Sequence, residues 1–293
     1  MPEPEASRAR VAVVVPCFND GATLPETLAS LASQEAAEVV VVDDGSDDPA
    51  TLAVLDEVER SGTRVLHREN SGQSAARMAG VGATSAPYVL AVDADDQLAP
   101  GALTALADAL DVHPAAGIAW GDTESFGEAT MHVRKARSLD PWAITYVNEL
   151  PTASLVRRDA LLAAGGWQLR EGYEDWDLWM GLAERGWQGV HVDRITLRYR
   201  LHGARSWASH FERHDTIVSQ LHARHPALFA ARRANWRRSS APWRLKLLLP
   251  VVERLPLSQA TTYRIVNFLA APGILLKLRL SRLVRRRSVR ILS

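Results

Sequence analysis

The 293-residue sequence has a single cysteine, Cys17, so no disulfide bond can form within the chain. This scarcity of cysteine fits a reducing compartment. The longest uncharged stretch of the basic tail, residues 265–276, is interrupted by Asn267 and Pro272 and is too short to span a bilayer. The first ten residues are polar, without the apolar run of a signal peptide. Together these absences predict a cytoplasmic protein.

Acidic residues are almost missing from the last part of the chain. Residues 231–293 contain 15 Lys and Arg and one acid, Glu253, whereas residues 1–230 contain 19 basic and 33 acidic residues. The net charge of zero therefore hides an acidic body and a basic tail. We predict two parts, an α/β domain of residues 1–230 and a helical, amphipathic tail of residues 231–293. The tail either meets an anionic partner or docks on the acidic body.

Apolar runs and helical patterns alternate along the first part of the chain. Runs that are apolar at every position indicate strands buried on both faces of a parallel sheet, at residues 11–15, 39–42 and 88–92. Helical patterns lie between and after them, at residues 24–32, 50–58, 74–83, 101–113 and 174–185. Later strands are expected near residues 118–120, 130–136 and 189–192. This alternation predicts an α/β fold with a mostly parallel sheet flanked by helices.

Polar groups follow three of these strands, and ligands of such sheets bind beyond the carboxyl ends of the strands. After the second strand comes Asp43-Asp44-Gly45. Asp and Gly favour turns, so this segment can be a plain acidic turn. A carboxylate here can also accept a strong hydrogen bond from a nucleobase N–H.

The third strand ends in three carboxylates within four residues, Asp93, Asp95 and Asp96. Their mutual repulsion is costly at the end of a buried strand unless a cation binds. Hard oxygen ligands suit Mg²⁺ or Mn²⁺, although a solvated turn remains an alternative. A calcium loop is excluded because Gln97 and Leu98 occupy its last two positions.

A third acidic cluster, Glu174, Asp175 and Asp177, lies at the start of a predicted helix. Acids at this place are favoured by the helix dipole without any further role. One of them can instead act as a general base toward an acceptor hydroxyl.

Five segments, in this order, resemble the family-2 glycosyltransferases of the GT-A fold. They are Val-Val-Val-Pro-Cys-Phe-Asn, Val-Val-Asp-Asp-Gly-Ser, Asn-Ser-Gly-Gln-Ser-Ala-Ala-Arg, Val-Asp-Ala-Asp-Asp and Tyr-Glu-Asp-Trp-Asp-Leu-Trp. The resemblance covers about two-thirds of the chain, residues 10–202. It implies a GT-A, Rossmann-like nucleotide-sugar-binding domain.

The resemblance also implies a role for each matching residue. Donor binding falls to Pro16, Phe18, Asp44, Gly72, Arg77 and Asp93. Among these, Asp44 would accept the N–H of the base, and Arg77 would lie near phosphate or the acidic turn. The divalent metal, Mg²⁺ or Mn²⁺, would be held by Asp95, Asp93 and His202.

Catalysis would rest on Asp175 as the base, with Glu174 orienting the acceptor or the base. Trp176 and Trp179 are candidate walls of the acceptor site, with core packing favoured for Trp179. The family's chemistry is an inverting, metal-dependent transfer of a sugar from a nucleotide-sugar to a hydroxyl. A UDP-sugar is the leading donor, with GDP and dTDP open.

The acceptor expected from the resemblance is a glycan or a lipid-linked sugar of the cell envelope or an exopolysaccharide. No Gln-x-x-Arg-Trp motif of processive synthases is present, which favours single additions. The basic tail, with its Trp and Leu residues, predicts peripheral binding to an anionic membrane on its inner face, and no nucleic-acid partner. Two alternatives stay open, a sugar-nucleotide nucleotidyltransferase and a non-catalytic module that binds nucleotide-sugar or membrane. A dehydrogenase is disfavoured, since no G-x-G-x-x-G follows the first strand.

Overall fold

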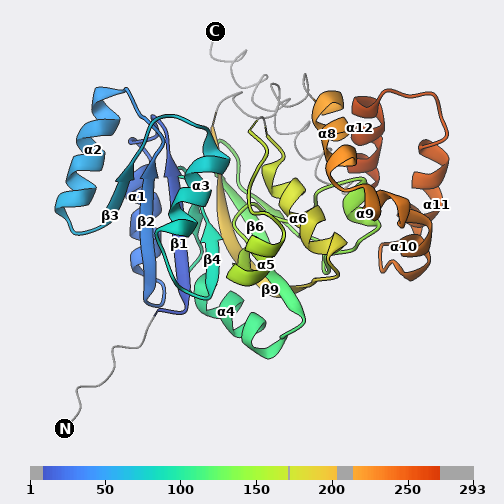
Figure 1. The fold of residues 1–293 in the computed structure, drawn as a ribbon, viewed down its shortest axis with the longest axis horizontal. Helices are drawn as coiled ribbons and strands as arrows, with labels where there is room; N and C mark the ends of the chain where they lie inside the picture. Colours follow the sequence, from blue (N-terminus) through green and yellow to red (C-terminus); the bar gives the residue numbers. More distant parts are fainter. Residues whose placement is uncertain (1–8, 171, 203–213, 271–293) are drawn as a thin grey trace, which may run out of the picture. The chain divides into compact units, whose positions relative to one another are not determined.

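The computed structural model describes residues 9–170, 172–202 and 214–270. These fall into two compact units, drawn in Figure 1. The first comprises Met1–Leu139 and Glu149–Leu201, and the second Asp140–Asn148 and His202–Ser293. The predicted boundary between residues 230 and 231 falls inside the second unit, and the division into functional domains stays a prediction. The last basic residues of the tail, 277–290, lie outside the described residues.

A mixed β-sheet forms the centre of the first unit. In the described residues it has nine strands, in the order β3-β2-β1-β4-β8-β6-β9-β5, with β7 paired to β6. The strands are β1 (Val11–Cys17), β2 (Ala37–Asp43), β3 (Arg64–His67), β4 (Tyr88–Ala91), β5 (Gln97–Leu98), β6 (Ala116–Gly127), β7 (Met131–Val133), β8 (Leu155–Arg157) and β9 (Gln188–Leu201).

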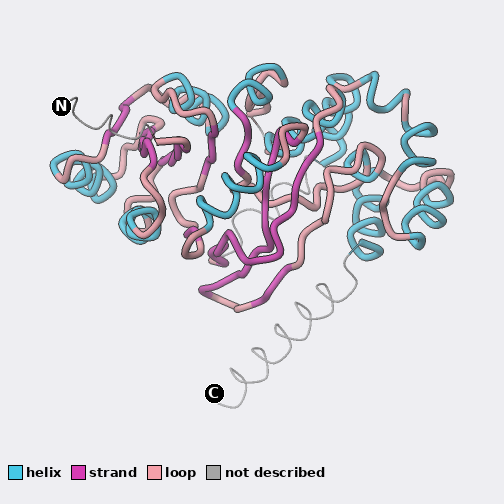
Figure 2. Tube along the Cα trace, turned by 90° about the horizontal axis from the view of Figure 1, so that it is seen from below, coloured by secondary structure: helices cyan, strands magenta, loops and turns pink. Residues whose placement is uncertain are grey.

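Helices cover both faces of this sheet (Figures 1 and 2). They are α1 (Leu24–Ala32), α2 (Pro49–Arg60), α3 (Gln73–Gly82), α4 (Ala102–Val112), α5 (Arg158–Ala163) and α6 (Glu174–Glu184). Alternate residues of β1, from Val11 to Cys17, share one hydrophobic cluster with α1, α2 and α4. Val14 points the other way and contacts Gly80 of α3. Because β1 is buried on both faces, its sequence can be apolar at every position.

The predicted α/β architecture is confirmed. Strands β3, β2, β1 and β4 run parallel, as their apolar runs predict. Strand β8 lies between β4 and β6 and runs antiparallel to both, and β5 pairs antiparallel with β9. The parallel order therefore holds in the part of the sheet built from the first strands, and the whole sheet is mixed.

The second unit is helical. Its helices are α8 (His214–Arg224), α9 (Pro226–Ala230), α10 (Arg232–Arg238), α11 (Trp243–Val252) and α12 (Gln259–Ala270), with the short η1 (Ala143–Thr145). Its core joins the segment 140–148 to the last two helices, through Trp142, Ala143, Tyr146, Val147, Leu245, Leu249 and Val266. Among the described residues, no helix has the length and apolar character needed to cross a membrane.

The close packing of α3 on β1 can be tested at Gly80. A Cβ atom at this position would lie 2.3 Å from Cγ1 of Val14, in the middle of the sheet. We expect Gly80→Ala to lower the free energy of unfolding by about 1–3 kcal/mol, since overpacking shifts a rigid core. Urea denaturation measures this change.

Gly82, on the same helix, provides the matched control. A Cβ atom there meets nothing within 4 Å. Gly82→Ala should leave stability unchanged or raise it by up to about 1 kcal/mol, because Ala favours a helix more than Gly. Equal stability of the two variants would contradict the packing described here.

Candidate active site

The loops after β1 and β2 are tied together by Asn19. This residue has a positive φ of 58°, a conformation that Asn tolerates better than most residues. Its Oδ1 accepts hydrogen bonds from the backbone N–H groups of Asp47 and Asp48, each at 3.0 Å. Just before it, Phe18 is exposed, whereas Pro16 and Cys17 are buried in β1. The loops thus present Phe18 at the carboxyl edge of the sheet.

Asp44 connects the end of β2 to the start of α3. Its Oδ1 accepts the backbone N–H of Ser71 at 3.1 Å, and its Oδ2 accepts that of Gly72 at 2.7 Å. Gly72 has a φ of 92°, which favours glycine, and it precedes the first residue of α3. Nε of Arg68 also lies 3.4 Å from its Oδ1. A carboxylate has about four acceptor positions, so these contacts do not exhaust Asp44. Asp44, Gly72 and the nearby Phe18 therefore surround one edge of the sheet.

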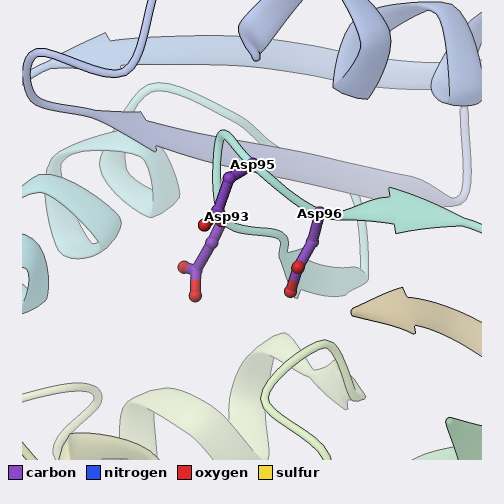
Figure 3. Close-up of side chains that lie close together, drawn as sticks. All are labelled: Asp93, Asp95 and Asp96. Carbon is purple, nitrogen blue, oxygen red and sulfur yellow. The ribbon is translucent and has the colours of Figure 1, made fainter. Parts of the chain in front are cut away.

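The three acids that follow β4 gather on one turn, shown in Figure 3. Ligand atoms of Asp93, Asp95 and Asp96 all lie within 4.8 Å of one another. Burial, together with the charges of Asp93 and Asp95, raises the pKa of Asp96 well above its ordinary value. The backbone N–H of Arg200 donates to Oδ1 of Asp96 at 2.9 Å. Asp96 thus anchors the turn to β9, while Asp93 and Asp95 are partly exposed.

Arg77 joins this turn to the acids of α6. Its side chain is fully buried, and its Nη2 donates to Asp93 at 2.8 Å. Its Nη1 donates to Glu174 at 2.9 Å and to Asp175 at 3.1 Å. Burial alone lowers the pKa of Arg77, but the charges of the three carboxylates outweigh this and raise it. One permanent cation therefore holds three carboxylates from two distant parts of the sequence.

Asp175 has the environment of a general base. Burial raises its pKa to about 7, and the positive charge of Arg77 opposes the rise. Indole Nε1 of Trp167 donates to Asp175 Oδ1 at 2.8 Å. The residue before the helix, Tyr173, has a φ of 59° and packs edge-on against the ring of Trp176. A pKa near neutrality is the value that suits a proton acceptor at physiological pH.

Other predicted residues are placed differently. His202 follows β9 directly and is exposed, and in the described residues the cluster of possible metal ligands consists of Asp93, Asp95 and Asp96. Trp176 and Trp179 are both buried. Trp179 is core, as favoured, but the expectation that Trp176 forms an acceptor wall is wrong, because its ring is covered by protein.

Three residues of the site were not singled out from the sequence. Gln73 donates to Asp93 Oδ1 at 2.8 Å, Trp167 binds Asp175, and Arg200 donates through Nε to the backbone oxygen of Asp95. Gln73 lies inside one of the recognised segments, and Arg200 lies two residues before His202. Trp167 has no sequence signal, since its contact exists only when α6 packs beside the Gly165–Gly166 turn.

The acidic turn fits a divalent cation by its donor chemistry. Its partly exposed carboxylates, Asp93 and Asp95, offer hard oxygen ligands of the type that Mg²⁺ and Mn²⁺ prefer. Gln73 and Arg77 both donate to the same oxygen of Asp93, Oδ1. Such ions bind proteins through one or two carboxylates and complete their coordination with water and substrate phosphates.

Comparison with known proteins decides the family. The family model described as Glycosyl transferase family 2 matches residues 12–162, just over half of the chain. The chain belongs to this family. As a family-2 glycosyltransferase it is an enzyme of sugar transfer, which sets aside the nucleotidyltransferase and the non-catalytic module.

Relatives agree with this membership. An uncharacterized glycosyltransferase of Mycobacterium tuberculosis is 32% identical over 193 residues, which are 62% of this chain and 83% of the relative. An N-acetylglucosaminyltransferase of Bradyrhizobium elkanii is 40% identical over 118 residues, or 38% of this chain and 64% of the relative.

Solved structures confirm the predicted GT-A fold of this glycosyltransferase. S. aureus TarS 1-349 in complex with UDP-GlcNAc matches with a TM-score of 0.58 at 18% identity, over 88% of this chain and 90% of that one. The mannosyltransferase PcManGT from Pyrobaculum calidifontis, in complex with GDP-Man and Mn²⁺, matches with a TM-score of 0.57 at 17% identity. That match covers 92% of this chain and 87% of the other. At sequence identities this low, the similarity to these structures shows a shared fold and nothing further.

The charge cluster around Arg77 gives a prediction for stability. Arg77→Met leaves Asp93, Glu174 and Asp175 without their shared cation. We expect the free energy of unfolding at about pH 8 to fall by about 3–5 kcal/mol, the usual cost of removing one partner of a buried ion pair. Urea unfolding at several pH values measures it.

The sign of the pH effect follows from Asp175. Its pKa of about 7 in the folded protein exceeds the unfolded value of about 4, and losing Arg77 raises it further. Below about pH 7, deprotonation of Asp175 lowers the stability of both proteins equally as pH rises. Above about 7 only the variant goes on losing stability, so its deficit should grow as pH rises above about 7 and shrink below it. Arg60→Met, at an exposed pair with Glu57, is the control and should cost less than about 1 kcal/mol. An equal, pH-independent loss in both variants would contradict the buried cluster.

Proposed function

We propose that the enzyme is an inverting, metal-dependent glycosyltransferase that moves a sugar from a nucleotide-sugar to a hydroxyl of a glycan or lipid-linked acceptor. The observation that carries this proposal is the bridge made by Arg77. It places the acidic turn of Asp93 beside the buried carboxylate of Asp175. If Asp93 binds the metal and Asp175 is the base, the phosphate side and the proton-accepting side of the reaction lie next to each other.

The donor nucleotide is proposed to bind at the carboxyl edge of β1 and β2. Pro16, Phe18 and Asp44 would line the base pocket, with Asp44 accepting the base N–H. Gly72 leaves space for phosphate, because a Cβ atom there would contact only the Nε atom of Arg170, 3.8 Å away. Arg77 holds Asp93 in place rather than meeting phosphate itself.

UDP-GlcNAc is the first donor to test. A relative named as an N-acetylglucosaminyltransferase and a solved structure holding UDP-GlcNAc both support it. GDP-sugars come second, supported by the structure that holds GDP-Man.

Asp175 is proposed to act on the acceptor. It takes the proton of the acceptor hydroxyl while the hydroxyl oxygen attacks the anomeric carbon from the face opposite the nucleotide. The bond to the nucleotide diphosphate breaks as the new bond forms, so the configuration inverts. Trp167 and Arg77 fix the carboxylate for this step, and Glu174 orients the acceptor. Because Arg77 is already shared among three carboxylates, it cannot keep Asp175 as acidic as an ordinary ion pair would.

Asp93 and Asp95 are the proposed ligands of a divalent cation, with His202 as a further candidate. When bound, Mg²⁺ or Mn²⁺ offsets the negative charge that develops on the departing diphosphate. Asp96 stays behind these residues and keeps the turn attached to β9.

Metal dependence is the first functional prediction. EDTA should abolish transfer, and Mg²⁺ or Mn²⁺ should restore it. Asp95→Ala should stay folded, because it relieves repulsion in the acidic turn, and should lose affinity for the nucleotide diphosphate by calorimetry.

Asp193→Ala, at an exposed acid outside the turn, is the control and should bind and turn over like the wild type. Full activity in EDTA, or of the Asp95→Ala enzyme, would remove the metal from the proposal.

The second functional prediction concerns the base. Asp175→Asn keeps the shape of the side chain but cannot accept the proton, so turnover should fall by about 10²–10⁴-fold while donor binding persists. In the wild type, turnover should rise with pH through about 7 as Asp175 loses its proton. The variant should lack this rise.

Asp177→Asn is the control on the same helix and should keep the pH profile of the wild type. If Asp175→Asn turns over normally while Asp177→Asn does not, the base is Asp177 and the assignment is wrong.

A further inference from the structure

Helix α11 has two apolar faces with opposite environments. Leu245 and Leu249 are buried against the segment 140–148. The other face carries Trp243, Leu247 and Val251, spaced four residues apart, with exposed fractions of 76%, 59% and 54%. Side chains at this spacing lie along one side of a helix. We call these three residues, with the adjacent exposed Leu248, the α11 stripe.

Positive charge surrounds the α11 stripe. Between residues 226 and 270 the sequence has eight Lys and Arg and one acid, Glu253. That acid is already paired with Arg232 and accepts a hydrogen bond from the hydroxyl of Tyr146 at 2.8 Å. The cations of α10 and α11 that remain exposed are Arg233, Arg237, Arg238 and Arg244. The outward surface of these helices is therefore both apolar and cationic.

We propose that the α11 stripe and the exposed arginines of α10 form a binding surface for an anionic lipid bilayer. A Trp and aliphatic side chains on one face enter the boundary between headgroups and acyl chains, and cations beside them meet anionic headgroups. The binding does not depend on the chemistry of sugar transfer. The proposed membrane contact is one face of α11, distinct from the face that packs against Trp142.

The charges disfavour the other occupants of this surface. A second copy of the chain would bring an identical cationic surface against it. The segment 271–293 of the same chain carries seven Lys and Arg and no acid, so it repels the surface as well. A nucleic acid would satisfy the cations but would leave the α11 stripe in water. A bilayer with anionic lipids satisfies both the charge and the apolar area.

The test uses the full-length protein and vesicle flotation. Vesicles of phosphatidylcholine containing phosphatidylglycerol are compared with vesicles of phosphatidylcholine alone. The wild type should float with the anionic vesicles and be released by high salt. Trp243→Ser combined with Leu247→Ser should lower the partition coefficient by about tenfold or more, since two large apolar side chains no longer enter the bilayer.

Two further variants separate the contribution of the apolar side chains from that of the positive charges. Val112→Ser combined with Leu162→Ser removes equally exposed apolar side chains from the first unit, at 73% and 52% exposure, and should bind like the wild type. Arg237→Glu combined with Arg238→Glu should weaken binding to anionic vesicles only. Hydrolysis of the donor without acceptor should be unchanged in all three variants, which shows that the protein is folded.

Three results would overturn the proposal. The first is wild-type partitioning of the Trp243 and Leu247 variant, which would assign membrane binding to another segment. The second is equally tight binding of the wild type to neutral and anionic vesicles. The third is no vesicle binding together with a wild-type oligomer that the variant dissociates, which would make a second copy the occupant.

Discussion

The site depends on one buried cation. Arg77 lies on α3, packed against the sheet, and reaches Asp93 on one side and the first turn of α6 on the other. Burying a guanidinium is costly unless its donors meet acceptors, and here three carboxylates accept from Nη1 and Nη2, while Nε has no hydrogen-bond partner among the described residues. The same carboxylates are the groups to which the proposed mechanism assigns metal binding and proton transfer. In the proposed mechanism, the charges that stabilise this part of the fold are therefore also those that carry the reaction.

Two buried acids near this cation have raised pKa values, for different reasons. Asp175 is buried and receives only part of the field of Arg77, so its pKa rises to about 7. Burial and the charges of Asp93 and Asp95 also raise the pKa of Asp96 well above its ordinary value. Asp96 anchors the acidic turn to β9, whereas Asp175 is the proton acceptor only in the proposed mechanism.

The sequence predicted the parts of the fold that depend on local pattern. The run of valines in β1 and the periodicity of residues 24–32 were sufficient, because both elements are long and apolar. Strands β3, β5 and β8 were missed because they have four, two and three residues, too few for a period to be visible. The pairing of β5 and β8 also makes the sheet mixed, a property that no single strand encodes.

For the site, the motifs identified the acids but not the contacts between them. Arg77 was expected near the acidic turn or phosphate, yet its bonds to Glu174 and Asp175 span 97 and 98 positions of sequence. Trp167 was invisible for the same reason. In the tail, the composition indicated basic and apolar residues, but which of them face inward depends on the segment 140–148, far earlier in the chain.

Because residues 140–148 belong to the second unit, the chain passes between the two units more than once. The backbone leaves the first unit after residue 139, returns at residue 149 and leaves again after residue 201. The second unit is therefore built from two separate stretches of sequence. Cleavage at a single point cannot release it as a free polypeptide with its core complete. A chain that ended before α11 would keep Trp142 and Tyr146 but lose Leu245 and Leu249, the side chains that cover them. The helical end is therefore not an appended module, because part of its interior comes from residues 140–148, between two stretches of the first unit.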